Sequence, residues 1–284
     1  MMGRPDSGRQ GITALTLSWE SCDFLPRLIE STLQWADRFY ILDTGSTDGS
    51  REYLRERSST DNRLKYFTID TDHTTFNRGR CVNSILDKID DDNVRSDWYA
   101  IIDCDEIFED DFVEHSLPII RNLPRIYTEV SFQRPTLWYS DSLARAHDFA
   151  FREPVFQRYR GGFRYPESVF HMSRSIHQSP VTFISKALLL NYELRDPRRS
   201  RVQFERLRLI DKDWIHLLKA PDDPPRLVRI TPLRDRGGEK SPNWRRIMLD
   251  LLRRRIRSLP KDSKTRRVLR SFKHTFTAGR SDAA

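Results

Sequence analysis

The chain has 284 residues, which is enough for one large α/β domain with an appendage. A hydrophobic content of 37%, with 16 Phe, 9 Tyr and 6 Trp, predicts a folded core. No apolar stretch approaches the roughly 18 residues of a membrane-spanning helix, and residues 1–10 lack the apolar core of a signal peptide. Three scattered cysteines argue against a disulfide framework or a zinc site. We therefore expect a cytoplasmic protein.

The net charge of +8 is unevenly spread along the chain. Residues 221–284 hold 18 of the 49 basic residues and 7 of the 41 acidic ones, a net of +11, so the preceding 220 residues carry −3. This asymmetry predicts two functional parts, a mildly acidic body and a basic tail.

Strands and helices alternate along the first hundred residues. Short apolar runs predict strands, and apolar residues at helical spacing predict helices between them. Alternating elements with short links are typical of a parallel sheet with crossover helices. The predicted strands cover 12–17, 38–42, 64–69 and 98–102, and the predicted helices cover 24–33, 76–89 and a segment around Tyr53 and Leu54.

The rest of the chain carries a weaker pattern. A helix is predicted over 110–120, another over 201–210, a proline-rich linker at 221–225 and a basic amphipathic helix at 245–257. The basic helix either packs on the body with its arginines in solvent, which we favour slightly, or lies on an anionic membrane surface, or contacts nucleic acid. The acidic body argues against nucleic acid. Short strands are predicted at 127–132, 136–139, 155–159, 181–184 and 187–190.

The segment 98–106, with the sequence WYAIIDCDE, joins the pattern of a buried strand to three carboxylates. Ligands of open α/β sheets bind beyond the carboxyl ends of the strands, where these acids fall. In continued extended geometry, Asp103 and Asp105 would project from the same face. Adjacent carboxylates repel unless a cation lies between them, and Mg²⁺ and Mn²⁺ take such oxygen ligands together with substrate phosphates. The motif indicates a metal–diphosphate site, with a solvated loop or a helix cap as the alternative.

A second motif, ILDTGSTDGS at residues 41–50, ends an earlier predicted strand. The two motifs in this order resemble a family 2 glycosyltransferase with the GT-A fold, and the resemblance runs from about residue 12 to about residue 112. It implies a Rossmann-like α/β fold whose mostly parallel sheet is flanked by helices. It also implies transfer of a sugar from a nucleotide-sugar donor, with Mn²⁺ or Mg²⁺ as the cofactor.

The resemblance implies roles for individual residues. Asp43 would contact the nucleobase or nearby donor groups, Asp103 would lie near the ribose or the water shell of the metal, and Asp105 would bind the metal directly. Glu106 would shape the site. Arg80 falls in a Gly-Arg element that binds the donor in relatives, although Cys follows it here where relatives carry Asn.

An inverting transfer also needs a carboxylate base that deprotonates the acceptor hydroxyl. Glu153, Glu167 and Glu193 are the candidates downstream of the acidic motif. Pro166-Glu167 falls where relatives carry a His-Glu pair, so the resemblance makes Glu167 the predicted base. The alternative is that Glu167 is an ordinary surface glutamate.

We divide the chain into a leader at 1–10, a nucleotide-sugar-binding half at 11–125, an acceptor-side half at 126–220 and a basic helical tail at 221–284. The expected partners are the donor and a glycan, lipid-linked or protein acceptor, with peripheral contact to the inner membrane face through the tail. Two other classes compete. A nucleotidyltransferase would carry a Gly-rich phosphate loop after the first strand, where the chain has SWESC. A non-catalytic protein on the same scaffold would act through its tail on a membrane or nucleic acid.

Overall fold

The computed structural model describes residues 11–71, 76–137, 140–145, 149, 152–159, 161–167, 176–177, 180–192, 227–240, 253 and 256. The predicted leader, the helix at 201–210 and the linker at 221–225 lie outside the described residues. In the helix predicted at 245–257, only Arg253 and Ile256 are described. Both are helical, Arg253 is exposed and Ile256 is buried, as the amphipathic pattern predicts.

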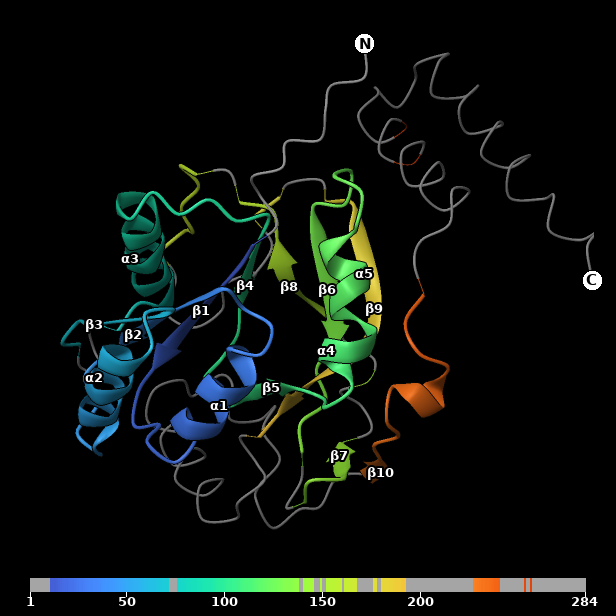
Figure 1. The fold of residues 1–284 in the computed structure, drawn as a ribbon, viewed down its shortest axis with the longest axis horizontal. Helices are drawn as coiled ribbons and strands as arrows, with labels where there is room; N and C mark the ends of the chain where they lie inside the picture. Colours follow the sequence, from blue (N-terminus) through green and yellow to red (C-terminus); the bar gives the residue numbers. More distant parts are fainter. Residues whose placement is uncertain are drawn as a thin grey trace, which may run out of the picture.

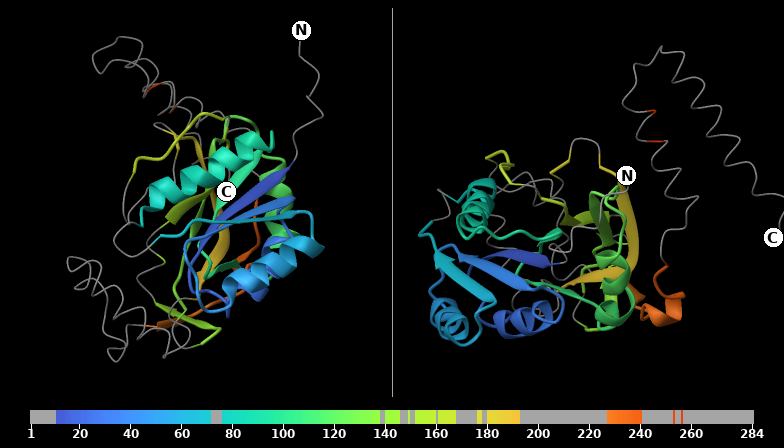
Figure 2. Two further views of the ribbon diagram at one scale, coloured as in Figure 1. Left: turned by 90° about the vertical axis from the view of Figure 1, so that its left-hand side faces the viewer. Right: turned by 45° about the horizontal axis from the view of Figure 1, so that its top comes forward.

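The first half of the chain forms the predicted alternation of strands and helices (Figure 1). Neighbouring strands in this half are parallel. Figure 2 shows α3 on one face of these strands and α1 and α2 on the other. The strands are β1 (Ile12–Ser18), β2 (Arg38–Asp43), β3 (Leu64–Thr68) and β4 (Trp98–Ile101), and the helices are α1 (Leu25–Thr32), α2 (Ser50–Thr60) and α3 (Arg78–Asp91).

Alternating side chains along these strands explain why both faces are covered. Phe39 and Ile41 of β2 pack with α1 in one hydrophobic cluster, whereas Tyr40 and Leu42 pack with α3 in another. Successive strand residues point to opposite faces, so a run such as FYIL needs an apolar partner on each side. The near-continuous apolar runs of the sequence therefore specify a sheet buried between helices.

The second half extends the same sheet in the order β3-β2-β1-β4-β8-β6-β9-β5. Only β8 and β5 run against the other strands, so the predicted α/β class with a mostly parallel sheet is confirmed. The segments predicted as separate strands at 181–184 and 187–190 form one strand, β9. The added strands are β5 (Glu106–Phe108), β6 (Glu129–Gln133), β8 (Arg152–Gln157) and β9 (Thr182–Asn191).

The helix predicted at 110–120 is instead two short helices, α4 (Phe112–His115) and α5 (Leu117–Arg121). They join at Ser116, and Pro118 lies in the first turn of α5. Proline has no backbone N–H to donate, which suits a first turn and interrupts a longer helix. The prediction was therefore right about helical character and wrong about continuity.

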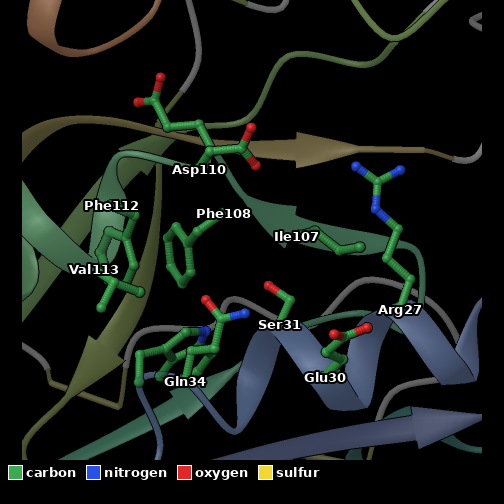
Figure 3. Close-up of a pocket in the computed structure, with 11 residues that line it drawn as sticks. Arg27, Glu30, Ser31, Gln34, Ile107, Phe108, Asp110, Phe112 and Val113 are labelled. Atoms are coloured by element: carbon green, nitrogen blue, oxygen red, sulfur yellow. The ribbon is translucent and has the colours of Figure 1, made fainter.

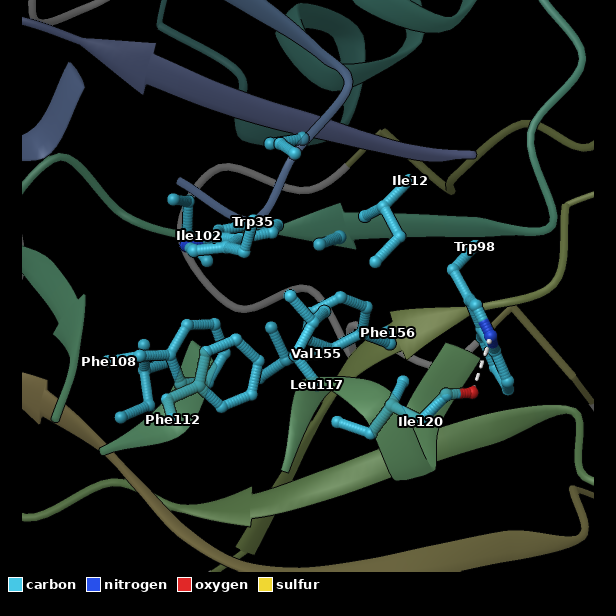
Figure 4. Close-up of a cluster of buried hydrophobic side chains, with 14 of the residues drawn as sticks. Ile12, Trp35, Trp98, Ile102, Phe108, Phe112, Leu117, Ile120, Val155 and Phe156 are labelled. Atoms are coloured by element: carbon cyan, nitrogen blue, oxygen red, sulfur yellow. Dashed lines mark hydrogen bonds between the residues drawn. The ribbon is translucent and has the colours of Figure 1, made fainter. Parts of the chain in front are cut away.

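A cluster of aromatic side chains, including Phe108 of β5 and Phe112 of α4, fills the core on one side of the sheet (Figure 4). Phe108 stacks on Phe112 with ring centroids 3.9 Å apart, and the edge of Trp35 meets Phe108 at 5.5 Å. On the same side of the sheet, the indole N–H of Trp98 donates to the carbonyl of Ile120 at 3.2 Å, the dashed line in Figure 4. Buried aromatic area of this size fixes β5, the strand that follows the acidic motif.

The start of the predicted tail belongs to the folded body. β10 (Leu227–Arg229) pairs with β7 (Leu143–Arg145) in a small antiparallel sheet, and Leu233 is fully buried. Residues 234–236 form a short 3₁₀-helix that packs beside β9 and α4 (Figure 1). None of the helices in the described residues combines the length and the apolar character needed to cross a membrane.

Candidate active site

The loops that follow β1, β2 and β4 meet at one edge of the sheet. The strands are in register there, and Thr44 N donates to Ser18 O at 2.9 Å. A side chain of the first loop reaches each of the other two: Glu20 Oε1 accepts from Thr47 N at 2.6 Å, and the Ser21 hydroxyl donates to Cys104 Sγ at 3.1 Å. The two motifs therefore lie together at the carboxyl edge, as strand order requires.

Asp43 is fully buried and its carboxylate closes the turn after β2. Oδ1 accepts from the N–H groups of Gly45 and Ser46, at 3.1 and 3.0 Å, and pairs with Arg51 Nε at 2.9 Å. Oδ2 accepts from the Ser46 hydroxyl. Gly45 has φ +112°, and an added Cβ would meet Thr71 O at 2.9 Å, so the turn requires glycine there. In the described contacts, both oxygens of the Asp43 carboxylate therefore bind groups of its own turn and of α2.

A tight turn also follows β4. The strand ends at Ile101, and Glu106 N donates to Asp103 O at 3.0 Å. Glu106 Oε2 accepts in return from Asp103 N at 2.8 Å, and Glu106 is fully buried. The extended geometry that would align Asp103 with Asp105 therefore stops before them. We call residues 103–106 the acidic turn.

Two arginines from distant elements pair with the acidic turn. Arg78, the first residue of α3, forms an ion pair with Asp103 Oδ1. Arg134, which follows β6, pairs with Glu106 and lies 3.5 Å from Asp103 Oδ2. Its Nη1 is also 3.6 Å from Glu153 Oε1 on β8. One guanidinium thus links three carboxylates, and the low exposure of the turn strengthens these contacts.

The predicted donor-binding Arg80 and the predicted base Glu167 lie together, 2.9 Å apart and more than half exposed. The pairing follows from close contact between α3 and residues 163–167. An added Cβ at Gly79 would lie 2.1 Å from Pro166 O, so only glycine allows this approach. The hydrogen bond that Arg80 donates to the Glu167 carboxylate raises the pKa of Arg80. The structure brings Arg80 to Glu167 and brings Arg78 to Asp103.

Asp105, the third residue of the acidic turn, is half-buried. Its carbonyl accepts from Tyr192 N at 2.7 Å, and the Tyr192 hydroxyl accepts from Arg27 at 2.6 Å. Within the described residues, no three His, Cys, Asp or Glu side chains form a metal cage. Mg²⁺ commonly binds one or two carboxylates with substrate phosphates and waters, so the donor set of the turn fits a metal completed by substrate.

A small crevice lies between α1 and the segment from β5 to α4 (Figure 3). Arg27, Glu30 and Ser31 of α1, together with Gln34 just beyond its end, face β5 across the crevice. Its volume is about 160 Å³, below the ≈ 300–1,000 Å³ of typical ligand pockets. The crevice is therefore too small for a nucleoside diphosphate, although it adjoins the strand that leaves the acidic turn.

The family model described as Glycosyl transferase family 2 matches residues 18–177, more than half of the chain. The chain belongs to glycosyl transferase family 2. The match covers both motif loops, the acidic turn, β6, β8 and the loop that carries Glu167. The GT-A resemblance is thereby confirmed at the level of family, and glycosyl transfer is the activity that membership supports. No curated protein sequence matches the chain.

Solved structures resemble this family 2 glycosyltransferase only distantly. They include the mannosyltransferase PcManGT from Pyrobaculum calidifontis with GDP-Man and Mn²⁺ (15% identity, TM-score 0.34, 44% of this chain and 36% of that one). GalNAc-T7 with UDP, GalNAc and Mn²⁺ shows 10% identity and a TM-score of 0.39, over 68% and 46%. HddC from Yersinia pseudotuberculosis shows 12% identity and a TM-score of 0.31, over 69% and 99%. The chain spans less than half the length of the first two, and TM-scores this low carry no argument about the site.

Arg78 and Arg134 are the residues that sequence reasoning missed. Arg78 stands beside the expected Arg80 in the run NRGR, and the Asn77 cap was the local signal that places it in the first turn of α3. Arg134 has no signal in the sequence around it, because its partners lie in the acidic turn and on β8.

Proposed function

We propose that this protein transfers a sugar from a nucleoside-diphosphate donor to an acceptor hydroxyl, with Mn²⁺ or Mg²⁺ bound at the acidic turn. The observation that carries the proposal is the acidic turn itself, a carboxylate-rich turn at the carboxyl edge of the sheet that Arg78 and Arg134 hold in place. In a family 2 glycosyltransferase, this arrangement offers carboxylates for a metal and guanidinium groups for a diphosphate.

Asp105 is the proposed direct metal ligand. Asp103 already pairs with two guanidinium groups, so its proposed role lies nearer the ribose and the water shell of the metal. When bound, the metal would neutralise charge on the leaving diphosphate. Arg78 is placed to share that task, because a guanidinium next to Asp103 lies within reach of an anion beside the same carboxylate.

Asp43 supports donor binding by holding the turn after β2 in shape. Its carboxylate is used by Gly45, Ser46 and Arg51, which leaves the backbone of this turn as the surface offered to the donor. Arg80 remains a candidate for binding the donor at the solvent-exposed side of the site. Its side chain is 63% exposed, and its partner Glu167 is similarly exposed.

Among the described residues, Glu153 and Glu167 are the candidates for the base that deprotonates the acceptor. Glu193, the third candidate from the sequence, lies outside the described residues. Glu153 is 38% exposed and is linked to the acidic turn through Arg134. Glu167 lies against the first turn of α3, where it pairs with Arg80. Contact with the network of the turn makes Glu153 the stronger candidate in our proposal. The acceptor class remains a glycan, lipid-linked or protein hydroxyl, and peripheral membrane contact through the basic tail is part of the same proposal.

The test is thermal stabilisation by nucleoside diphosphates and nucleotide-sugars, each with and without Mn²⁺. A ligand at 100 times its Kd stabilises the folded state by about 2.7 kcal/mol, a rise in Tm of roughly 5 °C. We expect one nucleotide to give a metal-dependent shift that Asp105→Ala abolishes. Asp110→Ala, which removes an exposed carboxylate outside the turn, is the matched control and should keep the shift. Absence of any shift with folded wild-type protein would overturn the proposal.

A further inference from the structure

Beyond the acidic turn itself, the short strand that leaves it is tied to the C-terminal part of the chain. β5 contains only residues 106–108 and pairs only with β9 among the described strands. Glu106, its first residue, closes the acidic turn, and Glu109 follows its last residue. Whatever fixes Glu109 therefore fixes the downstream end of the strand on which the turn depends.

Glu109 is 7% exposed and has two partners outside its own segment. Its Oε1 accepts from Leu188 N on β9 at 2.7 Å and pairs with Arg236 Nη2 at 2.5 Å. Burial raises the pKa of Glu109, and the charge of Arg236 opposes that rise. A buried carboxylate that loses its cation is left with an uncompensated charge, which is strongly unfavourable.

Arg236 is itself held firmly, since residues 227–240 are anchored at several points. β10 pairs with β7 at the start of this segment, and the side chain of Leu233 is fully buried within the main core cluster. At its end, Glu239 Oε2 accepts from Lys186 N at 2.9 Å and from the hydroxyls of Ser116 and Ser185. The segment is thus attached to both β9 and the α4–α5 region.

From these contacts we propose that residues 227–240 act as a clamp that sets the geometry of the acidic turn, with Arg236 as a positioning residue. The clamp acts through Arg236, Glu109 and β5 on Glu106, and it holds the turn ready for a divalent cation. The expected effect of the clamp on metal binding rests on the proposed function. The expected effect on the local stability of β5 is independent of that function.

The test compares Arg236→Ala with Arg234→Ala in the full-length chain. Arg234 lies in the same 3₁₀-helix, is 69% exposed at its side chain and pairs with Asp235, so it is the matched control. Backbone hydrogen exchange of a peptide covering 103–109 is measured without metal, and a peptide covering 38–43 of β2 serves as the internal reference. We expect Arg236→Ala to speed exchange in 103–109 about tenfold or more by lowering the local opening free energy, with β2 unchanged. Arg234→Ala should match wild type.

The second measurement is the affinity for Mn²⁺ alone, by titration at a temperature where every variant is folded. We expect the Kd to rise about tenfold in Arg236→Ala, less in Arg236→Lys, and to stay within about twofold in Arg234→Ala. Arg236→Lys keeps the charge and serves if the alanine variant does not fold. Equal exchange and equal affinity in the Arg236 and Arg234 variants would overturn the clamp, as would faster exchange spread equally over β2. A wild-type protein that binds no Mn²⁺ would count against the proposed function, and the exchange measurement would still decide the clamp.

Discussion

The turn after β2, which we call the first turn, and the acidic turn after β4 are stabilised by the same kind of contact. They differ in where the partner residues come from. In each, a buried carboxylate accepts a backbone N–H of its own turn and pairs with an arginine. Asp43 pairs with Arg51, eight residues further along the chain on α2, whereas Glu106 pairs with Arg134, which follows β6 and is 28 residues away. The first turn is closed by local contacts, and the acidic turn is held by Arg78, Arg134 and Glu153 from three distant elements.

This difference agrees with a supporting role for the turn after β2 and with the role in transfer that we propose for the acidic turn. A turn whose carboxylate is satisfied by its own residues keeps its shape without a ligand. A turn whose carboxylates share arginines with other elements holds charges that a bound cation and diphosphate can rearrange. We therefore expect changes in the first turn to affect mainly stability, and changes around the acidic turn to affect mainly transfer.

The largest effect is expected for Glu153→Gln. Removal of a general base typically lowers the rate by about 10²- to 10⁴-fold, and the amide keeps the size of the side chain and a hydrogen-bond acceptor for Arg134. The measurement is kcat for transfer with saturating donor, with Tm as the check on folding. Glu167→Gln is the matched variant and should change kcat by less than about threefold, because its known partner is the exposed Arg80. The reverse pattern would assign the base to Glu167.

The next effect is a loss of stability in Asp43→Ala. Removal of one partner from a buried ion pair costs about 3–5 kcal/mol, and the 26% exposure of Arg51 places the expected cost near the lower figure. Urea denaturation of the purified variant measures it. Asp70→Ala is the control, because Asp70 bonds the same arginine with its side chain 86% exposed and should cost less than about 1 kcal/mol. Equal losses in the two variants would show that the first turn is not closed by Asp43.

A smaller effect on donor binding distinguishes Arg78 from Arg80. Arg78→Ala removes a charge-assisted contact worth about 1.5–3 kcal/mol, so the donor Kd should rise roughly 10- to 100-fold. Arg80→Ala removes a side chain that is 63% exposed and should change the Kd by less than about threefold. Titration with the nucleotide identified by thermal stabilisation gives both values. A larger loss in Arg80→Ala would favour Arg80, the residue predicted from the sequence, as the donor-binding arginine.

The local turn signals were readable from the sequence, and the contacts between distant elements were not. A buried strand followed at once by acids or by Asp-Thr-Gly-Ser predicted both turns and their shared edge, because side-chain period and strand order fix the carboxyl ends. The choice between Arg78 and Arg80 was not accessible in this way. Residues two apart on a helix point about 160° apart, so Arg78 and Arg80 direct their guanidinium groups to nearly opposite sides of α3. Arg134 reaches the acidic turn only through the sheet order β4-β8-β6, which no local pattern encodes.

The smallest expected effect is on stability, in a variant of Asp48. This residue connects the turn after β2 to the loop after β1. Burial opposes ionisation of Asp48, but hydrogen bonds from the Ser50 hydroxyl, Cys22 N and Ser50 N outweigh it and lower the pKa of this carboxyl. A lowered pKa gives stability that is complete above the ordinary Asp value of about 3.9 and is lost as pH falls through the lowered value. Asp48→Asn should therefore be slightly less stable than wild type at pH 7, and the gap should close towards pH 2. Urea midpoints of both proteins at pH 7, 5, 3 and 2 test this. A gap that stays constant with pH would mean that the Asp48 charge contributes nothing to the stability of the turn after β2.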